Sequence, residues 1–142
     1  MKVIFLDIDG VIALPVPGRK TVLPSRACIE QLNRVTDATG AKIVLSSGRR
    51  FNPDIETTLA EWGVRGEIIG RTPIVGNGLG GNHAEEIGTW LANCLEPVET
   101  FVILDDDPID GELQSKAVST NWATGLTSTA AEEAMARLIS AS

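Results

Sequence analysis

The sequence lacks the features that mark secreted, membrane-spanning or disulfide-bonded proteins. Its two cysteines, Cys28 and Cys94, fall inside expected helices without a C-x-x-C spacing, so we expect buried, reduced thiols rather than a disulfide. The longest apolar runs have only the length of a strand, which excludes a transmembrane helix. No basic segment with a long apolar run precedes the first expected strand. We therefore expect a cytoplasmic protein without a secretion signal.

Basic residues are also scarce. Twelve Lys and Arg stand against 19 Asp and Glu, which gives a formal net charge of −7. Extended nucleic-acid binding is not expected, because it relies on many basic side chains to neutralise phosphates, but a single terminal phosphate remains an acceptable substrate. Clustered carboxylates are often offset by a divalent cation. The acidic residues that suggest such a cluster are Asp7, Asp9, Asp105, Asp106, Asp107 and Asp110.

What the sequence does contain is an alternation of expected strands and helices. Nearly continuous apolar runs are typical of strands buried on both faces of a parallel sheet. The alternation therefore predicts an α/β fold: a three-layer, Rossmann-like parallel sheet with helices on both faces, in a single domain over residues 1–142. Strands are expected at residues 2–6, 41–45, 64–69, 101–104 and 116–120, and helices at 24–38, 52–62, 82–94 and 129–139.

The connecting segments carry their own signals. Residues 13–23 hold two prolines, a glycine and the pair Arg19-Lys20, which predicts a loop or short flap. Residues 76–81 are rich in glycine but lack the Lys and Ser/Thr of a P-loop, so we expect an ordinary loop. Capping boxes are expected where a polar residue precedes a glutamate by three positions. They would be formed by Asn82 with Glu85 and by Thr129 with Glu132.

Three of the expected strands end in polar side chains. Asp7 and Asp9 follow the first strand, residues 46–49 (Ser-Ser-Gly-Arg) follow the second, and Asp105 and Asp106 follow a later one. The carboxyl ends of parallel strands meet at one edge of the sheet, so these side chains are expected to converge. There one carboxylate can attack phosphorus, a second can transfer a proton, and Mg²⁺ can bring them to an anionic substrate. A serine hydroxyl and an arginine would hold the phosphoryl oxygens.

These motifs resemble those of the haloacid dehalogenase superfamily of phosphohydrolases. The resemblance extends from residue 2 to about residue 110, in the family's order. Residues 5–11 (Phe-Leu-Asp-Ile-Asp-Gly-Val) resemble its first motif, residues 47–49 (Ser-Gly-Arg) its second, and residues 103–106 (Ile-Leu-Asp-Asp) its fourth. The resemblance implies that Asp7 is the nucleophile and Asp9 the general acid and base. It also implies that Mg²⁺ is bound by Asp7, by the backbone carbonyl of Asp9, and by Asp105 and Asp106.

The resemblance leaves the phosphate-binding residues partly open. It implies that Ser47 binds the phosphoryl group, with Ser46 as the alternative, beside Arg49. The family's third motif usually places a Lys or Arg near the start of the helix before the fourth motif, but here residues 82–86 read Asn-His-Ala-Glu-Glu. His83, the only histidine, is the nearest substitute. The alternatives are cations from loops: Arg49, Arg50 or Arg71.

The spacing leaves no room for the cap domain that many members carry. An uncapped site implies access for large substrates such as nucleic-acid ends or phosphoproteins, or closure by a second subunit. The chain resembles more narrowly the small uncapped members with a later Glu-Ile-x-x-Trp-Leu, here residues 86–91, some of which belong to RNA end-repair proteins. Trp62, Trp90 and Trp122 are expected in the core or at subunit contacts.

The leading expectation is a Mg²⁺-dependent phosphomonoester hydrolase that works through an aspartyl phosphate on an open site. Its substrate would be a nucleic-acid end, a nucleotide or another phosphate ester. One alternative is a catalytically weak binding or regulatory domain that keeps the metal site, since the third motif lacks its cation. The other is a phospho-accepting receiver domain, which needs a Lys at the end of a late strand, whereas Lys116 begins its segment.

Overall fold

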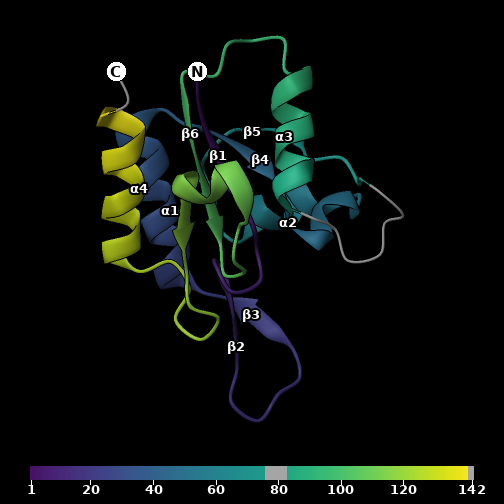
Figure 1. Cartoon of the computed structure of the whole chain (residues 1–142). Coiled ribbons are helices and arrows are strands. Elements are labelled where there is room, and N and C mark those ends of the chain that lie inside the picture. The colour runs from purple at the N-terminus through teal and green to yellow at the C-terminus, as the bar shows by residue number, and fades with distance from the viewer. Residues whose placement is uncertain (76–82, 141–142) are drawn as a thin grey trace.

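The computed structural model describes residues 1–75 and 83–140 and contains a five-stranded sheet whose neighbouring strands all pair in parallel (Figure 1). The strand order is β5-β4-β1-β6-β7, so β1 lies at the centre. The predicted α/β parallel sheet is therefore confirmed. The strands are β1 (Lys2–Leu6), β4 (Lys42–Leu45), β5 (Ile68–Arg71), β6 (Thr100–Asp105) and β7 (Ala117–Ser119).

Helices cover both faces of this sheet. They are α1 (Arg26–Thr39), α2 (Ile55–Glu61), α3 (His83–Asn93) and α4 (Ser128–Ser140), with short 3₁₀ helices η1 (Gly48–Phe51) and η2 (Gly111–Lys116). Buried residues of α1, α2 and α4 share one core cluster, whereas α3 contributes to a second cluster on the other face. Among the described residues there is no inserted cap domain, and no helix is both long and apolar enough to cross a membrane.

The central strand β1 shows why the sheet is buried on both faces. Its side chains alternate between the two clusters: Ile4 and Leu6 pack on the side of α1 and α4, and Val3 and Phe5 on the side of α3. All four are fully buried. The ring of Phe5 meets Trp90 of α3 edge to face at 5.5 Å between centroids. A strand enclosed in this way needs apolar residues at every position, which is the pattern that the sequence has.

The predicted flap is a small antiparallel hairpin. Its strands are β2 (Ala13–Pro15) and β3 (Val22–Pro24), and it projects beyond the end of the sheet at which β1 terminates (Figure 1). Arg19 and Lys20 lie in its exposed tip. The hairpin returns the chain to α1, where Ser25 caps the helix by accepting a hydrogen bond from the backbone N–H of Cys28 at 3.2 Å.

Two local expectations were wrong. The strand expected at residues 64–69 begins only at Ile68, because the side chain of Asn33 in α1 occupies the backbone groups before it. Asn33 donates to the carbonyl of Gly63 at 2.8 Å and accepts from the N–H of Arg65 at 2.9 Å, which holds this segment as a turn. At α4 the cap is Thr127, whose Oγ1 accepts from the N–H of Ala130 at 3.2 Å, whereas Thr129 lies inside the helix.

Of the remaining local expectations, one is confirmed, one was wrong in part, and two concern residues that the structure does not describe. Cys28 is buried in α1 and has a free thiol, as predicted. Cys94 also has a free thiol, but it follows the end of α3 and is only partly buried, so its predicted place inside a helix was wrong. The capping box expected at Asn82 and the loop at residues 76–81 lie outside the described residues.

Candidate active site

The polar strand ends meet in one pocket at the carboxyl edge of the sheet. The chain runs from β1 outward to β4 and β5, then returns to β6 and β7 on the other side of β1. Such a reversal leaves a crevice at the ends of the central strands. The pocket there has a volume of about 440 Å³. It is lined by Asp7, Asp9, Ser47, Gly48, Arg49, His83, Asp106, Asp107 and Trp122.

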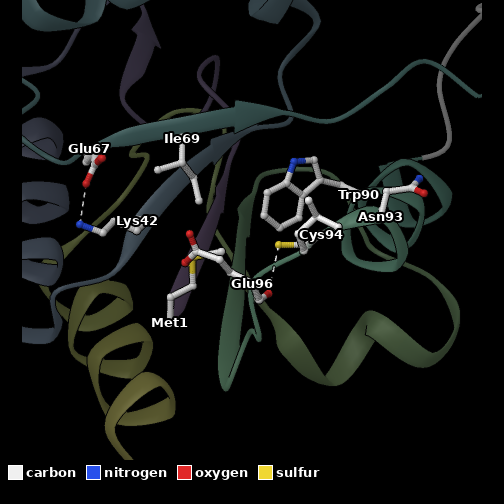
Figure 2. Close-up of a pocket in the computed structure, with 9 residues that line it drawn as sticks. Met1, Lys42, Glu67, Ile69, Trp90, Asn93, Cys94 and Glu96 are labelled. Carbon is white, nitrogen blue, oxygen red and sulfur yellow. Dashed lines mark hydrogen bonds and ion pairs between the residues drawn. The ribbon is translucent and has the colours of Figure 1, made fainter.

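A second hollow lies at the opposite edge of the sheet (Figure 2). Met1 and Lys42 line it at the starts of β1 and β4, and Trp90 and Cys94 line it from α3 and the residues after it. The ammonium group of Lys42 is paired with Glu67. Ligand sites of open parallel sheets lie at the carboxyl ends of the strands, so the pocket beside Asp7 is the candidate active site.

Three carboxylates form a compact cluster at that pocket: Asp7 and Asp106 line it, and Asp105 is buried beside them. Asp7, Asp105 and Asp106 each offer one oxygen atom, and these atoms lie within 4.8 Å of one another. Burial, followed by the negative charge of Asp105, raises the pKa of Asp7 to about 9. Burial also raises the pKa of Asp106, with the charges of Asp107 and Asp105 adding to it. The oxygen-only donor set of this cluster fits Mg²⁺.

The side chain of Asp9 lies apart from this cluster. Its carboxylate is paired with Arg49, with Nη2 2.9 Å from Oδ1 and Nε donating to Oδ2 at 3.3 Å. Both side chains are about one-third exposed, at 37%. The structure therefore separates the two carboxylates of the first motif: Asp7 faces the buried cluster, and Asp9 faces a cation at the pocket surface.

Gly10 allows the first motif to fold around the cluster. Its φ of +83° belongs to the left-handed region that side chains resist. A Cβ at this position would lie 2.6 Å from Cγ of Asp106, closer than any real contact. The carbonyl of Gly10 accepts a hydrogen bond from Oγ1 of Thr120 at 2.8 Å, which ties the turn to the end of β7. The glycine thus creates the space that the Asp106 carboxylate occupies.

The structure distinguishes the two serines. Ser47 lines the pocket, and its Oγ accepts a hydrogen bond from the N–H of Arg49 at 3.1 Å, which leaves the hydroxyl hydrogen available to a ligand. Ser46 is 1% exposed, does not line the pocket, and its Oγ lacks a hydrogen-bond partner within the described part of the chain. Of the two alternatives, only Ser47 lines the pocket.

Arg50 and Arg71 do not reach the carboxylate cluster. Arg71 is paired with Glu56 at 3.1 Å. Arg50 is buried and donates to Glu86 of α3 at 2.9 Å and to the carbonyl of Ser47 at 2.9 Å. This buried ion pair joins η1 to α3 and holds the chain at Ser47. Sequence reasoning missed it, although a glutamate within the apolar pattern of α3 was a signal.

His83 is the candidate cation that does contact the cluster. Its Nδ1 lies 2.7 Å from Oδ2 of Asp105, at the first residue of α3. The hydrogen bond to Asp105 raises the pKa of His83 despite the opposing effect of burial. A positively charged imidazolium is therefore favoured beside the carboxylates, in the region where a third motif would place its Lys or Arg.

Trp122 is a pocket residue that the sequence did not single out. It was expected in the core or at a subunit contact; the core placement was wrong, since Trp122 is 48% exposed and lines the pocket together with Asp7 and Ser47. It lies in the turn that follows β7. Its place beside the first motif depends on the pairing of β7 at the sheet edge, which no local pattern indicates.

Comparison with known proteins identifies a family that this chain matches. A model of the HAD domain in Swiss Army Knife RNA repair proteins matches residues 3–131. No curated protein and no solved structure matches the chain at a significant level. The matched segment runs from β1 into the first turn of α4, so it contains every residue that lines the pocket.

Proposed function

The chain belongs to the family of HAD domains in Swiss Army Knife RNA repair proteins, and we propose that it is a Mg²⁺-dependent phosphatase that removes the terminal phosphate from an RNA end. The observation that carries this proposal is the cluster of Asp7, Asp105 and Asp106, which offer one oxygen atom each within 4.8 Å of one another. Asp7 and Asp106 line the same pocket as Ser47. The RNA substrate is taken from the family's description, and it agrees with a pocket that no inserted domain covers among the described residues.

Asp7 is the proposed nucleophile. One of its carboxylate oxygens forms a bond to phosphorus while the bond from phosphorus to the RNA oxygen breaks, and water then hydrolyses the aspartyl phosphate. Mg²⁺, held by Asp7, Asp105, Asp106 and the carbonyl of Asp9, would supply the positive charge that keeps Asp7 ionised and offsets its repulsion from the phosphate. The backbone N–H of Ile8, which donates to Oδ1 of Asp7 at 2.9 Å, orients the carboxylate.

Asp9 is the proposed proton carrier. It would protonate the departing RNA oxygen and later accept a proton from the attacking water. Arg49 holds the Asp9 carboxylate in this structure, and it also lines the pocket. A bound phosphoryl group would compete for the same guanidinium group, and this competition would free Asp9 to take up and deliver the proton.

Ser47, Arg49 and His83 are the proposed phosphate-binding residues. The hydroxyl of Ser47 donates to a phosphoryl oxygen, and Arg49 offers a planar set of donors. His83 contributes a positive charge while its Nδ1 holds Asp105 at 2.7 Å. In this way His83 performs the work of the Lys or Arg in the usual third motif.

The receiver-domain alternative is not favoured by the position of Lys116. A receiver needs that lysine beside the acidic cluster, but Lys116 precedes β7, and its Nζ lies over the ring of Phe101 at 5.5 Å. Phe101 is near the start of β6, and the acidic residues follow the end of that strand. The lysine is therefore at the other end of the sheet from Asp7.

The proposed function is tested with RNA oligonucleotides that carry a 3′- or 5′-terminal phosphate. We expect release of inorganic phosphate with Mg²⁺, none with a chelator, and loss of turnover in Asp7→Asn. Asp110→Asn, an exposed carboxylate outside the cluster, is the matched control and should retain activity. Absence of turnover on a broad panel of phosphate esters would contradict the proposal. Mg²⁺ binding by calorimetry without any turnover would instead support a binding domain that keeps the metal site.

A further inference from the structure

Trp122 is an exposed aromatic residue at the rim of an otherwise polar pocket. Trp122 is 48% exposed, although removal of an aromatic side chain from water is favourable. The other described residues that line the pocket are acidic, basic or small: Asp7, Asp9, Ser47, Gly48, Arg49, His83, Asp106 and Asp107. Trp122 therefore provides the pocket with a flat apolar surface of a kind that no other described lining residue offers.

The turn that carries Trp122 is tightly hydrogen-bonded within itself. The carbonyl of Asn121 accepts from the N–H groups of Thr124 at 3.1 Å and Gly125 at 2.7 Å. The side chain of Asn121 accepts from the N–H of Ala123 at 2.9 Å. Trp122 thus lies within a turn that three hydrogen bonds to Asn121 close, and these bonds fix the backbone that carries the indole.

The same turn is hydrogen-bonded to the first motif. The N–H of Leu126 donates to the carbonyl of Val11 at 2.8 Å, and Oγ1 of Thr120 donates to the carbonyl of Gly10 at 2.8 Å. At Gly125, a Cβ would lie 2.7 Å from the Val11 carbonyl, so the two segments approach as closely as a glycine permits. In Figure 1 this turn lies at the same end of the sheet as the β2–β3 hairpin. The backbone of the turn that carries Trp122 is consequently held at a defined position relative to the first motif.

From this arrangement we propose that Trp122 is a stacking platform for the terminal base of the RNA whose phosphate enters the pocket. This inference rests on the proposed phosphatase function and adds a base-binding subsite to it. A terminal phosphate is separated from its base only by the ribose, so a base is the next flat group that the pocket meets. Stacking between a base and an aromatic side chain tolerates any sequence, because every base has a π-face.

The negative net charge of the protein favours base stacking, rather than phosphate contacts, as the source of its affinity for RNA. With a formal net charge of −7, contacts to several backbone phosphates contribute little. Single-stranded RNA ends present unstacked bases that aromatic side chains readily accept. Stacking on one aromatic ring contributes about 1–3 kcal/mol per base, measured as the loss on replacement by alanine. Trp122 would therefore supply a large part of the recognition beyond the phosphate itself.

The test compares an RNA that ends in a phosphorylated nucleotide with the same RNA ending in a phosphorylated abasic ribose. For the base-bearing substrate we expect Trp122→Ala to raise KM by about 5- to 150-fold with little change in kcat, and Trp122→Phe to retain most of the affinity. For the abasic substrate the wild-type protein and Trp122→Ala should have similar KM. Leu95 is fully exposed and lines the hollow at the opposite ends of the strands from Asp7. Leu95→Ala is therefore the control and should behave as wild type.

A binding measurement separates this inference from the proposed function. In the Asp7→Asn background, without Mg²⁺, a nucleoside monophosphate should quench tryptophan fluorescence, and the additional change Trp122→Phe should abolish the quenching. An unchanged KM in Trp122→Ala, an equal loss on the abasic substrate, or a larger loss on a phosphotyrosyl peptide would each overturn the stacking platform. If the wild-type protein hydrolyses no RNA end, the phosphatase proposal fails, and the quenching still decides whether Trp122 stacks on a base.

Discussion

Nδ1 of His83 lies 2.7 Å from Oδ2 of Asp105, so the first residue of α3 contacts the buried end of β6. This contact identifies a described cation that touches the carboxylate cluster. It connects the start of α3 with the end of β6.

Replacing His83 should weaken catalysis without unfolding the protein. Residues that orient a metal ligand typically contribute 10- to 100-fold to activity, so we expect His83→Ala to lower kcat/KM by about that factor, and His83→Lys to retain more activity. The hydrogen bond to Asp105 raises the pKa of His83, so activity that needs the imidazolium should persist above its ordinary value of about 6.5 and decline as pH rises further. A pH profile of kcat/KM checks this, and His83→Lys should extend the active range toward alkaline pH. An unchanged profile in His83→Lys would contradict the role.

The metal-free protein should lose stability as pH rises from acidic toward alkaline values. Burial and the charge of Asp105 raise the pKa of Asp7 to about 9, so the folded protein holds a proton that the unfolded chain releases near its ordinary pKa of about 3.9. Stability therefore falls between these values, and it falls less in Asp7→Asn. At about pH 8, thermal unfolding without metal should show Asp7→Asn to be more stable than wild type by a few degrees. Added Mg²⁺ should raise the melting temperature of wild type more than that of Asp7→Asn. The opposite order would argue against a buried, uncompensated cluster.

Gly10→Ala should remove metal binding, whereas Gly18→Ala should not. Both glycines have positive φ, +83° and +77°, so each substitution carries a similar backbone strain of about 1–2 kcal/mol. At Gly10 the new Cβ also lies 2.6 Å from Cγ of Asp106, whereas nothing lies within 4 Å at Gly18. Calorimetric titration with Mg²⁺ compares the two variants directly. Equal Mg²⁺ affinity in both would show that Asp106 is not needed in its observed position.

Ser47→Ala and Ser46→Ala should separate the two candidate hydroxyls. Hydrogen bonds to charged groups contribute about 1.5–3 kcal/mol, so loss of the Ser47 hydroxyl should raise KM for a phosphate substrate by roughly 10- to 150-fold. Among the residues that the structure describes, the buried Oγ of Ser46 has no hydrogen-bond partner, so its removal should leave KM unchanged and stability unchanged or slightly higher. Steady-state kinetics and denaturant unfolding measure the two effects. A larger KM effect at Ser46 would reverse the assignment.

Breaking the pair of Arg50 and Glu86 should destabilise the protein. Removal of one partner leaves a buried charge uncompensated, which typically costs about 3–5 kcal/mol, so we expect this loss in Glu86→Ala and a smaller one in Glu86→Gln. Urea unfolding measures it. Because Arg50 also donates to the carbonyl of Ser47, the variants that fold should bind phosphate more weakly. If Glu86→Ala lowers the free energy of unfolding by less than about 1 kcal/mol, the pair contributes no more to stability than a solvent-exposed ion pair does.

The carboxylate cluster was predictable because its parts are local in sequence. Asp7 and Asp105 each end a strand of apolar residues, and the rule that parallel strands end at one edge brings them together. The start of β5 was not predictable in the same way. It depends on Asn33, which binds the backbone of Gly63 and Arg65 from about thirty residues away. A local pattern contains no information on such a competitor.

By itself the sequence determined the α/β architecture and the strand ends that carry the carboxylates, because burial alternation and turn residues act between neighbours in the chain. Only the tertiary structure decided which charged group meets which, and which aromatic residue borders the pocket. Those outcomes depend on the packing of segments far apart in sequence, which sets the direction of each side chain. They are the pairing of His83 with Asp105, of Arg49 with Asp9 and of Arg50 with Glu86, and the place of Trp122 beside the candidate active site.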